Sequence, residues 1–225
     1  MQTKRSYQDG CATAHAMDLI GERWALLVAR ELILGPKRFT DLRAGLPAIS
    51  PNVLTQRLDE LEAVSVVVRR KLPPPAATWV YELTPWGREL ETVIMALGRW
   101  GARSPALAQG HPLSRDGLIL SWRTMFSSAR AGDLSGEIEI RMGDDRFLAR
   151  LEDGHLQIDR GSAAAPDAVL EASPDTLAAL AYSGRKLNEA VQAGALKVEG
   201  DKALLKRFLA SFPLPEPAED LSAGA

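Results

Sequence analysis

The sequence has few of the residues that build metal, redox or catalytic sites. It contains one cysteine and three histidines in 225 residues. A single cysteine excludes an internal disulfide, and none of the histidines stands at a metal-ligand spacing from cysteine or acidic residues. We find neither a glycine-rich phosphate loop nor a nucleophile-elbow motif. The sequence therefore predicts no enzyme activity, no metal and no cofactor.

Long hydrophobic runs are also missing. No segment approaches eighteen uninterrupted apolar residues, and the start of the chain lacks a signal-peptide pattern. The hydrophobic content of 46% is nevertheless ample for two domain cores. We therefore expect a soluble, cytoplasmic protein without membrane insertion.

The formal net charge of −2 conceals an uneven distribution of charge along the chain. Residues 1–103 contain 14 Lys and Arg against 11 Asp and Glu, whereas residues 104–225 contain 13 against 18. A positively charged half suits contact with a polyanion, and an acidic half does not. The asymmetry favours double-stranded DNA as a partner of the N-terminal half.

The most informative segment runs from Ser50 to Arg70. Ser50 can cap a helix with its hydroxyl group, and Pro51 suits the first helical position. On a period of 3.6 residues, apolar and polar side chains of this helix separate onto opposite faces. The apolar face holds Leu54, Leu58 and Leu61, and the polar face holds Asn52, Thr55, Gln56 and Asp59. Since Asn and Gln pair with adenine in the major groove, this pattern fits a recognition helix. By itself it fits an ordinary amphipathic surface helix equally well.

The flanking segments favour the DNA-binding interpretation. Residues 39–46 predict a short helix capped by Thr40, and two short helices joined by a turn resemble a helix-turn-helix. Residues 64–72 and 78–83 predict a β-hairpin with an irregular, proline-rich tip, whose basic residues would contact the phosphate backbone. The predicted DNA-binding residues are Thr40, Ser50, Pro51, Asn52, Thr55, Gln56, Arg57, Arg69, Arg70 and Lys71.

Residues 11–101 resemble the HxlR family of bacterial winged-helix transcriptional regulators, which is related to the MarR group. The segments that carry the resemblance are IGERW, RFTDLR, ISPNVLTQRL, YELTPWGREL and ALGRWG. The resemblance implies a three-helix core with a β-hairpin wing, a homodimer and a palindromic operator. The chain departs from the family at Val64-Ser65, where an Ala-Gly turn is common.

A further helix, opened by Thr84-Pro85, carries an apolar stripe that is longer than a small winged-helix core requires. The stripe consists of Leu90, Val93, Ile94, Leu97 and Trp100. We assign part of it to a partner subunit, because two recognition helices one DNA turn apart, roughly 34 Å, need a dimer.

The length of the chain predicts a second domain. We place the DNA-binding and dimerisation domain at residues 1–104, a linker at 105–116, the second domain at 117–213 and a disordered tail at 214–225. Within 117–213, alternating segments predict an antiparallel sheet with helices on one side. The fold class is therefore α+β throughout.

The second domain resembles the sterol carrier protein type 2 fold, in its strand meander and in the segment SPDTLAALAYSGRKLNEAVQAGALKVEGD. The resemblance implies an apolar cavity and a hydrophobic or lipid-like effector that is sensed rather than transformed. The predicted pocket residues are Trp122, Met125, Phe126, Phe147 and Tyr182. In the alternative interpretation, side chains fill the cavity and the domain only aids dimerisation or solubility.

Cys11 supports a competing mechanism. In regulators of the HxlR type, a cysteine at the matching place sometimes senses oxidants or electrophiles. Here Ala12-Thr13-Ala14 follows where the family often has proline, and no basic residue stands beside the thiol to lower its pKa. Two switches are thus open, an effector in the second domain and modification of Cys11. A third hypothesis is a lipid-binding carrier whose winged helix docks a protein partner.

Overall fold

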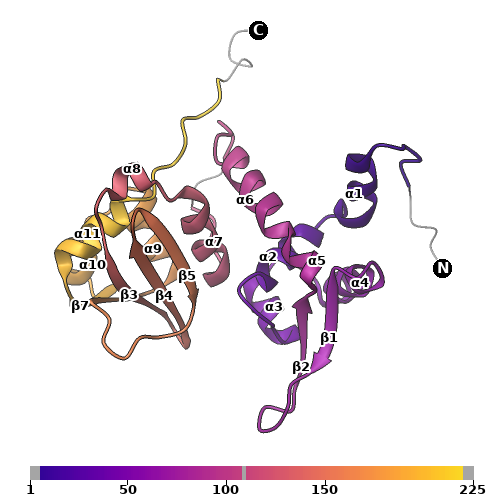
Figure 1. Cartoon of the computed structure of the whole chain (residues 1–225), viewed down its shortest axis with the longest axis horizontal. Helices are drawn as coiled ribbons and strands as arrows, with labels where there is room; N and C mark the ends of the chain where they lie inside the picture. Colours follow the sequence, from indigo (N-terminus) through magenta and orange to yellow (C-terminus); the bar gives the residue numbers. More distant parts are fainter. Residues whose placement is uncertain (1–5, 108–109, 220–225) are drawn as a thin grey trace. The chain divides into compact units, whose positions relative to one another are not determined.

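The computed structural model describes residues 6–107 and 110–219 (Figure 1). The chain forms two compact units whose boundary follows Ile94, and we call them the N-terminal and the C-terminal unit. The predicted boundary lay ten residues later. Helix α6, Leu90–Gly101, continues through the boundary, so its last turns are grouped with the C-terminal unit. In the described ranges, no helix has both the length and the apolar character to cross a membrane.

The N-terminal unit is a winged helix, as predicted. Its core is formed by apolar side chains of α2, α3, α4 and the wing strands, including Val28, Leu42, Leu58 and Val67. The elements in chain order are α1 (Ala12–Ile20), α2 (Ala25–Leu32), α3 (Phe39–Gly45), α4 (Pro51–Ala63), β1 (Val67–Lys71), β2 (Trp79–Leu83), α5 (Pro85–Arg88) and the start of α6.

Helix α4 begins where the sequence predicts. The Ser50 hydroxyl accepts a hydrogen bond from the Val53 N–H at 3.3 Å, and Pro51 occupies the first helical turn. Leu54, Leu58 and Leu61 are at most 1% exposed, so the apolar face is fully packed. Burying three leucines contributes about 5–9 kcal/mol of transfer free energy, which holds the polar face outward.

The start of α3 differs from the prediction. Thr40 was expected to cap this helix, but the capping residue is Arg38, and Thr40 lies inside the first turn. The Arg38 backbone N–H donates to the Asp41 carboxylate at 3.2 Å, as in a capping box. The prediction was wrong because it relied on the hydroxyl of Thr40 as a cap. The helix instead begins at Phe39, and the Asp41 side chain accepts the hydrogen bond from the Arg38 backbone N–H.

The predicted wing is confirmed. Strands β1 and β2 pair antiparallel from Val67–Leu83 to Lys71–Trp79. Lys37 exchanges two backbone hydrogen bonds with Tyr81, at 3.0 and 2.8 Å, which joins the loop before α3 to the wing. The three prolines interrupt the strands and lie in the turn at the tip.

The C-terminal unit is an α+β domain with a five-stranded sheet in the order β5-β4-β3-β6-β7 among the described residues. Helices α7 and α11 pack on the sheet, and α9 packs against both of these helices (Figure 1). Its elements are α7 (Arg115–Met125), α8 (Ser128–Ala131), β3 (Gly136–Met142), β4 (Asp145–Glu152), β5 (His155–Arg160), β6 (Ala168–Ala172), α9 (Pro174–Tyr182), α10 (Leu187–Gln192), β7 (Leu196–Gly200) and α11 (Lys202–Ala210).

One pairing corrects the predicted antiparallel sheet: β3 and β6 run parallel, so the sheet is mixed. Strand β5 has the same direction as β3, because β4 is antiparallel to both. The connection 161–167 must therefore cross the length of the sheet before β6 begins. Sequence alternation identifies strands but contains no information about the path of such a crossover.

The ends of the C-terminal unit also differ in part from the prediction. Helix α7 begins at Arg115, capped by Ser114, so the last two residues of the predicted linker are helical. In the predicted disordered tail, the Ala218 N–H and the Glu216 carbonyl are hydrogen-bonded to Arg103 at 2.7 and 3.0 Å. Residues 108–109 of the linker and 220–225 of the tail lie outside the described residues.

Candidate nucleic-acid interface

The outward face of α4 is polar and open. Asn52, Thr55, Gln56 and Asp59 are all exposed, and together with Glu60 and Ala63 they line an open surface depression. Three of the predicted DNA-binding residues, Asn52, Thr55 and Gln56, thus lie together on one helix face. The Thr55 hydroxyl donates to the Pro51 carbonyl at 3.1 Å, so that side chain is oriented by the helix itself.

Arg57 does not belong to this face, which corrects the prediction. Its side chain is buried, with only 6% of the residue exposed. One Nη atom lies 2.6 Å from a Glu60 carboxylate oxygen and 3.5 Å from Glu22. Arg57 borders the packed side of the helix because it lies three residues after Leu54 and four before Leu61, and two carboxylates compensate its charge. We therefore remove it from the DNA-contacting set.

Glu60, which pairs with Arg57, also contacts Gln56. The Gln56 amide nitrogen donates to a Glu60 carboxylate oxygen at 3.0 Å, one helical turn away. Glu60 thus binds Gln56 with one oxygen and Arg57 with the other. Sequence analysis did not single out Glu60, although its spacing of four residues from Gln56 was visible.

The basic residues of the wing have different surroundings. The Arg69 guanidinium lies over the Trp79 ring, 4.8 Å from its centroid. Arg70 forms an ion pair with Glu82 at 2.5 Å. Lys71 is exposed at the outer end of β1. Lys71 therefore presents its charge to solvent, and Arg69 keeps its in-plane N–H donors while its face lies over the ring. Arg70 must exchange its ion pair with Glu82 to bind a phosphate.

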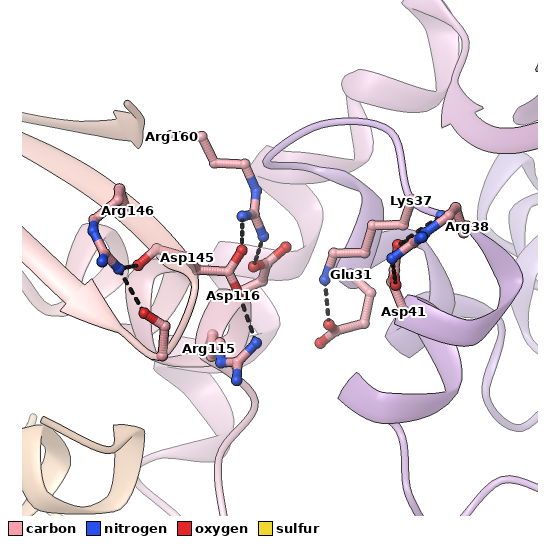
Figure 2. Close-up of polar contacts among 10 residues, drawn as sticks. Glu31, Lys37, Arg38, Asp41, Arg115, Asp116, Asp145, Arg146 and Arg160 are labelled. Atoms are coloured by element: carbon pink, nitrogen blue, oxygen red, sulfur yellow. Dashed lines mark hydrogen bonds and ion pairs between the residues drawn. The ribbon is translucent and has the colours of Figure 1, made fainter. Parts of the chain in front are cut away.

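Thr40 is exposed on α3 and directly precedes Asp41. Figure 2 shows the ion pair that Asp41 forms with Arg38. The guanidinium of Arg38 is 2.9 Å from the Asp41 carboxylate. Hydrogen bonding to Arg38 lowers the pKa of the Asp41 carboxyl and raises the pKa of the Arg38 guanidinium. Both groups are therefore charged at neutral pH.

A buried acid of α2, Glu31, lies against α3 and the loop that precedes it. Glu31 is fully buried and forms ion pairs at 2.8 Å with Arg30 and with Lys37 (Figure 2). A Cβ atom at position 45 would lie 2.3 Å from a Glu31 carboxylate oxygen, so Gly45 gives this acid its space. The sequence analysis did not identify Glu31. Its place directly before Leu32, an apolar position of the packed helix, was the one indication that this acid could be buried.

The five predicted pocket residues of the C-terminal unit lie mainly in its core. Trp122 and Phe147 are fully buried, and Trp122 stacks on Phe212 with ring centroids 5.1 Å apart. The Trp122 indole N–H has no hydrogen-bond acceptor among the described residues. Met125 is also buried, while Phe126 and Tyr182 are partly exposed.

Tyr182 forms a polar contact inside the C-terminal unit. Its hydroxyl lies 2.7 Å from the Ser121 hydroxyl. Burial raises the pKa of Tyr182 to about 12, although the bond to Ser121 opposes this shift. The phenol is therefore neutral over the physiological range.

A charged cluster in the C-terminal unit joins the turn before β4 to the start of α7 (Figure 2). Asp145 is 2.8 Å from Arg115 and 2.5 Å from Arg160, and Arg160 also pairs with buried Asp116. Burial tends to raise the pKa of Asp145, but the two guanidinium groups outweigh it and leave that pKa below its ordinary value. Asp145 ends the predicted turn and holds the two segments together.

Cys11 is exposed and precedes the first residue of α1. Its sulfur forms no capping hydrogen bond, but the backbone N–H groups of Thr13 and Ala14 lower the pKa of the thiol. This cause was invisible in the sequence, where only charged neighbours were considered. Over residues 6–107 and 110–219, no group of three or more His, Cys, Asp and Glu is arranged to hold a metal ion.

Comparison with known families gives two matches along the chain. Residues 19–107 match the HxlR-like helix-turn-helix model, and residues 123–218 match the alkyl sulfatase C-terminal model. The second match is compatible with a fused domain of the sterol carrier protein type. It includes strands β3 to β7 and helices α8 to α11, but only the end of α7.

Individual proteins are similar to parts of the chain. The uncharacterized HTH-type transcriptional regulator YybR of Bacillus subtilis is 35% identical over 97 residues, which are 42% of this chain and 75% of YybR. YodB of the same organism, an HTH-type transcriptional regulator, is 38% identical over 85 residues, 38% of this chain and 76% of YodB. The sec-alkylsulfatase Pisa1 from Pseudomonas sp. is 20% identical, with a TM-score of 0.44, over 48% of this chain and 18% of Pisa1.

The matched N-terminal residues include α2, α3, α4 and both wing strands, which are the elements that present the polar face of α4. The relatives matched over this part carry the name of transcriptional regulators. The chain therefore belongs to the HxlR-like helix-turn-helix family, as a transcriptional regulator with a further C-terminal unit.

Proposed function

We propose that the protein is a homodimeric regulator in the cytoplasm that binds a palindromic operator. The outward polar face of α4, held by three buried leucines, carries the proposal. In this arrangement α4 enters the major groove and its N-terminal residues contact base edges, while the wing lies along the phosphate backbone. Lys71 and Arg69 supply charge for that backbone, and Arg70 supplies more once it exchanges its ion pair with Glu82.

The surface of α6 supports the dimer. No residue of α6 or α1 is buried in the single chain. Val93 and Leu97 are exposed, and Trp100 is 75% exposed, all on one helix. A large apolar patch on a soluble protein indicates an interaction surface, and a second copy of α6 presents the complementary face.

We further propose that a hydrophobic small molecule in the C-terminal unit controls operator binding. The buried indole N–H of Trp122 supports this, because a buried donor without an acceptor costs about 1–3 kcal/mol. A ligand with one acceptor and an apolar body would satisfy that donor while contacting the aromatic cluster. The effector need only bias two dimer arrangements by about 1–3 kcal/mol to change operator occupancy.

A second candidate switch is the Cys11 thiol. The specific observation in its favour is the lowered pKa at the start of α1, because the thiolate is the reactive form. Modification of Cys11 would act on α1, which has no buried residue in the single chain and is available to a dimer interface. Both switches would act on the spacing of the two recognition helices.

The decisive experiment titrates the full-length protein with duplex DNA from immediately upstream of its own gene and with random duplex, over a range of salt concentrations. A regulator prefers the upstream duplex by about a thousandfold or more at physiological salt. Equal affinity for the two duplexes at every salt concentration would contradict the proposal. That result would favour the carrier whose winged helix docks a protein.

Two further measurements separate the switches. Native mass spectrometry of protein purified from cells detects an apolar small molecule that remains bound to the C-terminal unit. Operator binding before and after oxidant treatment, compared with Cys11→Ser, tests the thiol. An unchanged oxidant response in Cys11→Ser would exclude Cys11 as the switch.

A further inference from the structure

The orientation of the Gln56 amide is determined by its partner. An ionised carboxylate only accepts hydrogen bonds, so the atom of Gln56 that lies 3.0 Å from Glu60 must be the amide nitrogen. The usual ambiguity between the nitrogen and oxygen of a glutamine is therefore absent. Gln56 directs one N–H along the helix toward Glu60, and its carbonyl oxygen and second N–H remain available.

When the N–H that points away from the carbonyl is the one that donates to Glu60, the carbonyl oxygen and the second N–H lie on the same edge of the planar amide, one acceptor beside one donor. Adenine presents the complementary pair in the major groove, an N7 acceptor beside an N6 donor. We propose that Glu60 is a positioning residue for base recognition, because it fixes the Gln56 amide in the orientation that pairs with adenine. This inference rests on the proposed function, in which α4 lies in the major groove.

Arg57 explains why a carboxylate can be tolerated on a helix that faces DNA. The second oxygen of Glu60 is 2.6 Å from the buried Arg57 guanidinium, so the charge of Glu60 is compensated from within the protein. Arg57 carries only donors and cannot change its role. Arg57 and the Gln56 amide nitrogen therefore both act as donors, and Glu60 accepts from each of them.

The network makes Glu60→Gln an informative substitution. The new side chain has one acceptor and one donor end, and the donors of Arg57 attract its carbonyl. Its amide nitrogen then faces Gln56 and pairs with the Gln56 carbonyl, which turns that amide by half a rotation. The acceptor and donor offered to the base exchange places, and the match to adenine is lost.

The test uses the full-length protein and a pool of duplex DNA with a randomised core. Sites selected by the unchanged protein should contain a position where replacing adenine costs about tenfold or more in affinity. Gln56→Ala, Glu60→Gln and Glu60→Asp should all lose this preference. Glu60→Asp retains the charge that Arg57 needs but is one methylene shorter, so it separates loss of positioning from loss of stability.

Asp59→Asn is the matched control. Asp59 lies on the same exposed face, and its substitution removes the same negative charge while leaving the contact between Gln56 and Glu60 in place. This variant should bind all duplexes more tightly and keep its preference for adenine. In a Gln56→Ala background, Glu60→Gln should cause no further loss of selectivity, since it acts through Gln56.

Three results would overturn the inference. If Glu60→Gln and Glu60→Asp keep the adenine preference, Glu60 does not position Gln56. If Asp59→Asn loses the preference equally, charge alone is responsible. If Gln56→Ala still selects the same sites, Gln56 does not contact the base, although operator binding itself stands. Failure of the unchanged protein to enrich any sequence would instead reject the proposed function, and this inference with it.

Discussion

The Thr84 hydroxyl donates a hydrogen bond to the Ser65 carbonyl oxygen at 2.7 Å, at the point where α4 ends and the wing begins. The same hydroxyl oxygen accepts from the Gly87 N–H at 3.0 Å and caps α5. One side chain therefore fixes both the exit from the recognition helix and the start of the next helix. The direction in which the wing leaves α4 depends on this contact.

Ser65 itself has a backbone conformation that favours glycine, with φ of +61°. The Val66 N–H bonds to the Leu61 carbonyl at 2.9 Å and the Ser65 N–H to the Glu62 carbonyl at 3.0 Å, which is a Schellman motif. Ser65→Gly should relieve about 1 kcal/mol of strain. We expect hydrogen exchange of α4 and β1 peptides to slow by about fivefold, while Ser65→Ala, which keeps the Cβ atom, gives no gain. Faster exchange in Ser65→Gly would contradict this.

Local patterns predicted the elements of the N-terminal unit because each depends on a few neighbouring residues. Ser50 and Pro51 set the start of α4, and the three leucines set its packed face. Contacts between elements were not predicted. The burial of Arg57 against Glu22, for example, depends on how the segment before α2 approaches α4, which periodicity does not contain.

The C-terminal unit shows the same limit on a larger scale. Alternation predicted β3, β4 and β5, but not that β6 pairs parallel with β3. Trp122 was predicted as a pocket residue, yet it stacks inside an aromatic cluster with Phe212. Apolar residues at helical spacing fit a core and a ligand pocket equally, and only the three-dimensional packing distinguishes the two.

Lys71 provides a test of the wing. Because it is exposed and we assign it to the phosphate backbone, Lys71→Ala should weaken binding to every duplex alike and lower the slope of log affinity against log salt by about one. The matched control is Lys186→Ala, which removes an exposed lysine from the C-terminal unit. A loss confined to the preferred sequence would show that Lys71 contacts a base instead.

The exposed stripe of α6 should control the oligomeric state. Leu97→Asp places a charge in the apolar surface, and Trp100→Ala removes its largest side chain. Each change removes about 1.5–3 kcal/mol of burial per subunit, so dimer dissociation constants should rise by more than tenfold. Sedimentation velocity over a concentration series measures this shift. Val191→Asp, at an exposed apolar position on α10, serves as control and should leave the dimer intact.

Cys11 is the only cysteine of the chain, so its alkylation can be followed without interference. Since backbone N–H groups lower the pKa of this thiol, the thiolate is present at lower pH in the folded protein. The rate of reaction with iodoacetamide should therefore reach half its maximum below the ordinary value of about 8.5, and return to that value in urea. If the alkylation rate depends on pH in the same way in the folded and the unfolded protein, the fold does not lower the pKa of the thiol.

The ion pair of Arg38 and Asp41 should make the stability of α3 depend on pH. Because Arg38 lowers the pKa of Asp41 in the folded state, the stabilisation is complete above the unfolded value of about 3.9 and is lost as pH falls further. Both side chains are more than a third exposed, so solvent screening keeps the effect small. Hydrogen exchange of α3 should be slower in the unchanged protein than in Asp41→Asn at neutral pH. This difference should shrink near pH 3 and in high salt. A difference that persists at pH 3 would mean that packing of the side chain, and not its charge, stabilises the helix.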